Sequence, residues 1–169
     1  ETRLFAKALG REEAAEQVIA QVESRIAEVA ALVEARIPEA QRDATLVRWM
    51  PQGPLVMAEG LFSASILRAV GFRIDDNDLV KEGRPHSEPL SLENLSSMDQ
   101  SWVFLATLNA DGDKALEAAR QSPAFARLDA VEHDRVITVS GQLWTSATGP
   151  LAVLAILDDI EAAVTAIQP

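Results

Sequence analysis

Short apolar runs that alternate with helical segments limit the fold of this chain more than any other feature of its sequence. Three such runs stand at residues 45–50 (TLVRWM), 102–107 (WVFLAT) and 135–139 (RVITV), and helical patterns separate them. Strands of this kind are buried on both faces, as in a parallel sheet whose two sides are covered by helices. The sequence therefore predicts an α/β fold: a three-layer αβα sandwich with a mostly parallel sheet.

A long amphipathic helix is predicted before the first of these strands. Residues 11–36 are rich in Ala and Glu, and Pro38 follows them. At about 25 residues this helix is longer than a compact domain of this size usually needs. The apolar residues that recur at helical spacing, and that we expect to pack against the domain, are Val18, Ile19, Val22, Ile26, Val29, Ala30 and Val33.

The other connections have recognisable helix signals. Residues 61–70 read as a helix ending at Gly71, and a final helix opens at Gly149 and Pro150. Residues 72–89 are polar and contain Gly and Pro, which predicts a loop. A short helix capped by Ser91 follows, and another is expected over residues 114–121.

Composition excludes several classes of function. The formal charge is −11, with 15 basic residues scattered among 26 acidic ones, which argues against a nucleic-acid surface. There is no cysteine and no tyrosine, and only two histidines are present, so disulfides and thiolate metal sites are excluded. We expect no metal site and no cofactor. Iron, if the protein handles it, would arrive already wrapped in an organic chelator.

Neither a membrane span nor a catalytic motif is recognisable. No stretch approaches the roughly 18–20 apolar residues that a spanning helix requires, and the first ten residues do not resemble a signal peptide. A chain that starts at Glu1 within a helical pattern reads as a processed or excised piece. Glycine-rich phosphate loops, Gly-x-Ser-x-Gly and His-Glu-x-x-His are absent, so we expect a protein that is not an enzyme.

Four segments in fixed order resemble a known family. They are the long helix, residues 60–71 (GLFSASILRAVG), residues 90–95 (LSLENL), and residues 122–131 (SPAFARLDAV) leading into the third strand. Trp144 and the final helix continue the match. Together they resemble periplasmic or lipoprotein binding proteins for ferric siderophores, haem and cobalamin, across nearly the whole chain.

The resemblance implies a domain organisation and a function. Proteins of this type hold a ligand between two α/β lobes joined by one long helix. Residues 1–38 would then be the connecting helix and residues 39–169 the C-terminal lobe, with the N-terminal lobe absent. The implied function is the solute-binding component of an ABC importer, which captures a ferric siderophore outside the cytoplasm and delivers it to the membrane permease. A lipid anchor would hold the protein at the membrane. Cobalamin and haem remain open as ligands, with haem less favoured because Tyr is absent.

Glu93 matches the family's C-lobe glutamate, which docks onto arginines of the permease. An exposed carboxylate on a short helix can accept a bidentate guanidinium, which suits that role. In the simpler alternative, Glu93 only stabilises the positive end of its own helix.

Aromatic residues near strand ends are the first ligand-binding candidates. Trp49 and Trp144 each fall at or just beyond the carboxyl end of a predicted strand, where open α/β sheets collect ligands. An indole there can pack against an organic chelator and donate one hydrogen bond. Trp144 lies in a polar segment, residues 142–148, which favours ligand contact, whereas Trp102 begins a strand and should pack inside.

Polar and apolar groups of two further segments complete the candidate site. Arg84 and His86 lie in the long predicted loop, where Arg84 could meet ligand oxygens and His86 could ligate haem. Phe62 and Ser63 match a region that often lines the cleft in the family. Solvated loop residues and ordinary core packing are the alternatives for these four positions.

Two other classes of protein fit the predicted fold. A flavodoxin-like enzyme or nucleotide-binding domain would need a phosphate-binding turn after the first strand, but Pro51 and Pro54 remove backbone donors there. A protein-interaction module built around the long helix would require an exposed, continuous apolar stripe on that helix.

Overall fold

The computed structural model describes residues 2–167 and contains one five-stranded sheet. β1 (Asp43–Met50), β4 (Trp102–Thr107) and β5 (Val136–Ser140) run parallel at its centre. β2 (Gly53–Val56) pairs antiparallel with the end of β1, and the two-residue β3 (Arg73–Ile74) pairs parallel with its beginning. The strand order is β2-β1-β4-β5, which confirms the predicted α/β fold with a mostly parallel sheet.

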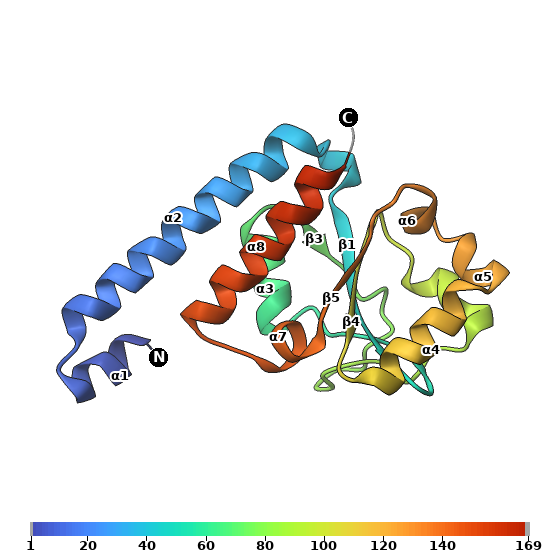
Figure 1. Cartoon of the computed structure of the whole chain (residues 1–169), viewed down its shortest axis with the longest axis horizontal. Coiled ribbons are helices and arrows are strands. Elements are labelled where there is room, and N and C mark those ends of the chain that lie inside the picture. The colour runs from blue at the N-terminus through green and yellow to red at the C-terminus, as the bar shows by residue number, and fades with distance from the viewer. Residues whose placement is uncertain (1, 168–169) are drawn as a thin grey trace.

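Helices cover both faces of the sheet (Figure 1). One face carries α3 (Phe62–Ala69), α7 (Gly141–Ser146), α8 (Pro150–Ala166) and the second half of α2 (Glu12–Arg36). The opposite face carries the 3-10 helix η2 (Leu92–Met98), α4 (Ala110–Arg120), α5 (Pro123–Ala126) and α6 (Asp129–Glu132). A short 3-10 turn, η1 (Glu39–Gln41), leads from α2 into β1.

Strand alternation divides the core into two apolar clusters. Successive side chains of a strand point to opposite faces. In β4, Trp102 and Phe104 therefore join the cluster beneath α3, α7 and α8, whereas Val103 and Leu105 join the one beneath η2 and α4. β1 alternates in the same way, so each face of the sheet has its own buried core.

The long helix α2 is anchored along its second half. Val29 and Val33 are buried in the first core cluster, and Arg25 forms ion pairs with Asp158 and Glu161 of α8. The first half of α2 instead contacts α1 (Thr2–Leu9), a helix that the sequence did not predict. The predicted helix is thus confirmed, but the earlier part of its apolar stripe is only half-buried.

Several local predictions differ from the structure. Residues 51–54 were expected only to end the first strand, yet β2 begins at Gly53, whose φ of 125° brings its backbone close to Leu90. α4 begins at Ala110 because the Asn109 side chain accepts a hydrogen bond from Gly112 N at 3.0 Å, earlier than predicted. The side chain of Ser91 makes no capping hydrogen bond to η2, although the residue stands at the predicted cap position.

Candidate functional site

The carboxyl ends of β1, β4 and β5 lie at one edge of the sheet, where ligands bind in open α/β folds. Two helix starts pack tightly against this edge. A Cβ on Gly112 would lie 2.9 Å from the Trp49 carbonyl oxygen, and one on Gly141 would lie 2.5 Å from the Thr107 carbonyl oxygen. Because α4 and α7 sit so close to the strand ends, the groups that reach solvent near this edge come from neighbouring segments.

Arg48 is a charged residue within the mostly apolar strand β1, which has Asp43 at its start. It stands two residues after Leu46 and therefore on the same face of the sheet. Its direct neighbours on the adjacent strands are Leu55 and Ala106. Its Nε atom is buried without a hydrogen-bond partner among residues 2–167, and no ion pair between those residues involves it. A part-buried cation of this kind costs folding free energy, so it is a strong candidate for a ligand contact.

Residues 85–90 run alongside β2 and extend the sheet edge. Pro85 O accepts from Ala58 N at 3.0 Å, Ser87 N donates to Val56 O at 2.8 Å, and Leu90 N donates to Pro54 O at 2.9 Å. The Ser87 hydroxyl also accepts from Val56 N at 3.0 Å. This part of the predicted loop is therefore held in place by the sheet.

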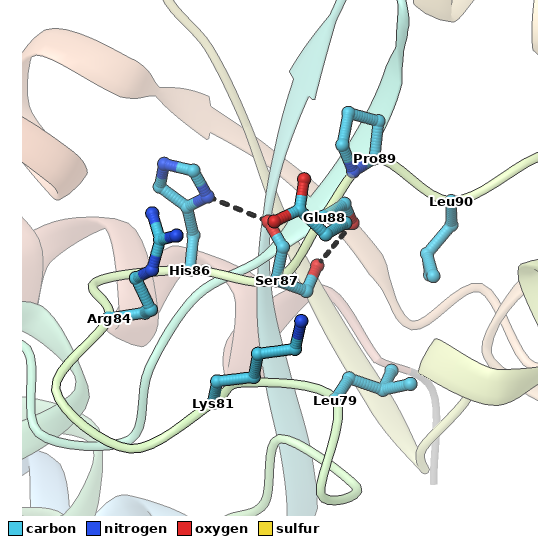
Figure 2. Close-up of a pocket in the computed structure, with 8 residues that line it drawn as sticks. All are labelled: Leu79, Lys81, Arg84, His86, Ser87, Glu88, Pro89 and Leu90. Carbon is cyan, nitrogen blue, oxygen red and sulfur yellow. Dashed lines mark hydrogen bonds between the residues drawn. The ribbon is translucent and has the colours of Figure 1, made fainter.

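A cavity of about 160 Å³ lies along this segment (Figure 2). The structure brings two predicted site residues, Arg84 and His86, together in its lining. Lys81 is a third basic residue there, and Glu88 is acidic. The remaining lining residues are Leu79, Ser87, Pro89 and Leu90.

His86 has a defined orientation in this cavity. Its Nδ1 lies 2.7 Å from the Ser87 carbonyl oxygen, and Figure 2 draws this bond. Because a carbonyl oxygen only accepts, Nδ1 donates in this hydrogen bond, and in the neutral imidazole Nε2 is then an acceptor or a possible metal ligand.

Phe62 and Ser63 occupy a different environment at the start of α3. Phe62 is half-buried and lines a second cavity, of about 400 Å³, with Ile19 and Val22 of α2 and with Pro150 and Val153 of α8. Ser63 is only 1% exposed, and its Oγ has no hydrogen-bond partner among the described residues. Phe62 and the predicted site residues of the loop thus line separate cavities, and Ser63 lines neither of them.

The tryptophans lie inside the protein. Trp144 was expected in a polar loop, and this placement is wrong: it lies in α7, is 2% exposed, and donates from Nε1 to Asp159 Oδ2 at 2.8 Å. Trp49 is also 2% exposed and packs edge-on against Phe125. Their burial gives no support to the predicted ligand contacts. Trp102 is fully buried, as expected.

Glu93 is exposed in the first turn of η2, beside the exposed Leu92. It forms no ion pair within residues 2–167, so its carboxylate is free to meet a partner. This position fits permease docking, which stays a prediction.

Negative charge gathers next to the start of α3. Burial raises the pKa of Asp76, and the negative charge of Glu59 raises it further.

Within residues 2–167, no group of three or more His, Cys, Asp or Glu side chains is arranged to hold a metal ion. None of the described helices is long and apolar enough to cross a membrane.

Comparison with known proteins now identifies the family. The model of the family described as periplasmic binding protein matches residues 2–143. The chain belongs to the periplasmic binding protein family. No curated protein sequence matches this member of the family.

Solved structures of binding proteins share the fold of this family member. SirA of Staphylococcus aureus aligns with a TM-score of 0.82 at 24% identity, over 99% of this chain and 64% of SirA. SirA complexed with staphyloferrin B aligns with a TM-score of 0.79 at 22% identity, over 99% and 60%. FeuA, the iron-uptake system-binding protein of Bacillus subtilis, aligns with a TM-score of 0.69 at 26% identity, over 95% and 57%. The chain therefore spans less than two thirds of the length of each of these proteins.

Arg48 and Lys81 are two basic residues of the candidate site that were not predicted from the sequence. A single charge inside an apolar strand was the available signal for Arg48, because strands buried on both faces rarely contain one. Lys81 had no comparable signal, since loop lysines are common and usually solvated.

Proposed function

We propose that this chain is the ligand-binding C-terminal lobe, with its connecting helix, of a ferric-siderophore binding protein that serves an ABC importer. The observation that carries the proposal is the alignment of 99% of the chain with SirA in its staphyloferrin B complex. Family membership supports a binding role and a place outside the cytoplasm.

The proposal includes a domain organisation. In the proposal, residues 1–38 connect two lobes and residues 39–169 form the second of them. The ion pairs of Arg25 with α8 support this division. They fix the second half of α2 to the lobe, whereas the first half of α2 contacts α1. The greater length of the relatives is consistent with a second lobe.

The basic groups of the site suit an iron chelate. Ferric siderophores present oxygen atoms that carry negative charge, and guanidinium groups bind such oxygens with two parallel hydrogen bonds. Arg48 and Arg84 have no ion-pair partner among the described residues, so both are available for this contact.

Haem is the second candidate ligand, and His86 is the observation that favours it. In the neutral imidazole, the hydrogen bond at Nδ1 leaves Nε2 available to ligate iron. Cobalamin has no specific support in the geometry.

Titration with a panel of iron complexes tests the proposal. The full-length protein and the 169-residue chain would each be titrated with ferric hydroxamate, catecholate and carboxylate chelates and with haem, following quenching of tryptophan fluorescence. We expect the full-length protein to bind a ferric siderophore and the chain alone to bind it weakly, because closure between two lobes buries such a ligand. Equal nanomolar affinity for both proteins would contradict the two-lobe site. Absence of binding to every iron complex would contradict the function.

The proposed partner is the importer's permease, with Glu93 as the docking carboxylate of this lobe and a lipid anchor as the attachment to the membrane. Glu93→Lys would replace attraction by repulsion against a permease arginine, a change that can cost several kcal/mol. Uptake through the cognate transporter should fall sharply, while ligand affinity and folding stay near normal. Glu117→Lys, at an exposed site on α4, is the matched control. Normal uptake by Glu93→Lys at equal expression would remove the docking role.

A further inference from the structure

The cavity beside residues 85–90 is too small to hold a whole iron chelate. Its volume is about 160 Å³, whereas complete small-molecule sites commonly occupy about 300–1,000 Å³. A cavity of this size can accept one arm of a larger ligand. The residues that line it therefore indicate which chemical groups that arm carries.

The floor of this cavity is apolar and fixed to the core. Leu79 and Leu90 line it, and both pack against the second core cluster, which contains Val56 and Leu95. Backbone hydrogen bonds from Ser87 and Leu90 to β2 hold the wall in place before any ligand binds. The cavity is therefore preformed, which lowers the entropy cost of binding.

The rim of the cavity is predominantly cationic. Lys81 and Arg84 are exposed, and neither forms an ion pair within residues 2–167. Glu88 is the acidic member of the lining, and its side chain makes no hydrogen bond with the described residues. Two unpaired cations at one cavity stand out in a chain whose formal charge is −11.

We infer that this cavity selects an anionic iron chelate, by accepting one carboxylate or catecholate arm between Lys81 and Arg84, over a chelate built from hydroxamates without free anionic groups. The inference rests on the proposed function and narrows it to one class of siderophore. A carbon-based arm lies on the Leu79 and Leu90 floor, and its anionic oxygens face the two cations. A ferric trihydroxamate is formally neutral at the metal centre and gains little from this rim.

Charge variants with matched controls test the inference in the full-length protein. The double variant Lys81→Gln/Arg84→Gln is compared with Lys114→Gln/Arg127→Gln, which makes the same charge change at exposed positions that do not line the cavity. Both are titrated with a ferric α-hydroxycarboxylate, a ferric tricatecholate and a ferric trihydroxamate at low and high salt. We expect the first variant to lose affinity for at least one of the two anionic chelates by about tenfold or more, with the trihydroxamate and the control variant unaffected.

Glu88→Gln provides a test of opposite sign. Removing the acidic group of the rim should raise affinity for the anionic chelate by about twofold to fivefold, because it removes a like-charge repulsion. Glu117→Gln on α4 is its control. A merely structural role for the loop predicts no gain from Glu88→Gln.

The outcomes separate the two proposals. If no ferric chelate binds the unaltered protein, the siderophore function itself fails. If chelates bind but the trihydroxamate is preferred, or if the Lys81/Arg84 variant binds anionic chelates normally, the function stands and the selection of an anionic arm is overturned. The carboxylate and catecholate titrations identify which arm the cavity accepts.

Discussion

The aromatic core and the 79–90 segment use side chains in opposite ways. Phe104 stacks on Trp102 at 6.2 Å and on Trp144 at 5.1 Å between ring centroids, and both indoles donate hydrogen bonds, to Gln41 O and to Asp159. In the 79–90 segment, backbone hydrogen bonds to β2 and Ala58 hold residues 85–90, while Lys81 and Arg84 reach solvent without ion-pair partners among the described residues. The large apolar groups stabilise the fold from within, and Lys81 and Arg84 stay exposed at the surface.

The largest effect should come from the aromatic stack. Trp102→Ala and Trp144→Ala are each expected to lower the free energy of unfolding by about 3–5 kcal/mol, because each leaves a cavity and an unpaired acceptor in a packed core. Urea denaturation measures this change. Lys81→Gln, as the comparison from the exposed segment, should stay within about 0.5 kcal/mol of the unaltered protein. If Trp144→Ala lost affinity for the ligand without losing stability, Trp144 would instead be a ligand-binding residue.

Close packing above the strand ends should have the next largest effect. Gly141→Ala would place a Cβ 2.5 Å from the Thr107 carbonyl oxygen, so the start of α7 would have to move. We expect a loss of about 1–3 kcal/mol in the free energy of unfolding. Gly60→Ala is the control, since a Cβ there has nothing within 4 Å. An unchanged stability in Gly141→Ala would mean that α7 does not pack directly on the end of β4.

Arg48 lies in β1, between β4 with its aromatic stack and β2 with its covering segment. We expect substitution of Arg48 to change stability and ligand affinity in opposite directions. Arg48→Met keeps a long side chain and removes a buried, unpaired Nε, so the free energy of unfolding should rise by about 1 kcal/mol. The same variant should weaken binding of a ferric chelate. Parallel denaturation and fluorescence titration test both expectations. A destabilised variant with normal affinity would assign Arg48 to the structure alone.

The smallest effect concerns pH and the amino end of β1. Burial acts to raise the pKa of Asp43, but hydrogen bonds from Ser101 N and Oγ, with the charge of Arg73, outweigh it, so the pKa is lowered. Asp43 therefore contributes stability above the ordinary carboxyl pKa of about 3.9, and this contribution is lost as the pH falls below that value.

Asp43→Asn should remove this dependence. Between pH 7 and pH 3 the unaltered protein should lose more unfolding free energy than the variant does, by less than about 1 kcal/mol. The comparison requires urea denaturation at both pH values. Identical losses in the two proteins would show that the folded and unfolded pKa values of Asp43 are equal.

Helices and strands whose type and bounds depend on their own residues were predicted correctly from the sequence. The apolar run at β4 was predicted residue for residue, and α2, α3 and α8 were found within about two residues of their bounds, as periodicity and terminal Gly or Pro allow. β2 was missed because its Gly and Pro are turn residues, and only pairing with β1 and residues 85–90 makes it a strand.

The candidate site was predicted less completely, for the same reason. Arg84 and His86 were found because a long polar segment with Gly and Pro predicts an accessible loop. Trp144 was misplaced because α7 covers the first part of what read as a polar loop, and the helix packs its one indole against Phe104. Tertiary packing decides which way such a residue points, and a local pattern does not contain that information.

The pairing of residues 85–90 with β2 also bears on aggregation. An unpaired edge strand exposes N–H and C=O groups that can recruit strands from other molecules. Here Ser87 and Leu90 occupy such groups of β2 and Pro85 pairs with Ala58 just beyond it, while Pro85 and Pro89 themselves bring no N–H to the new edge. Substitutions in this segment that open the pairing would therefore carry a solubility cost as well as a binding cost. Sequence changes that retune ligand choice are safest at Lys81, Glu82 and Arg84, whose side chains are exposed and lie outside the strand cover, whereas the φ of 76° at Gly83 favours glycine.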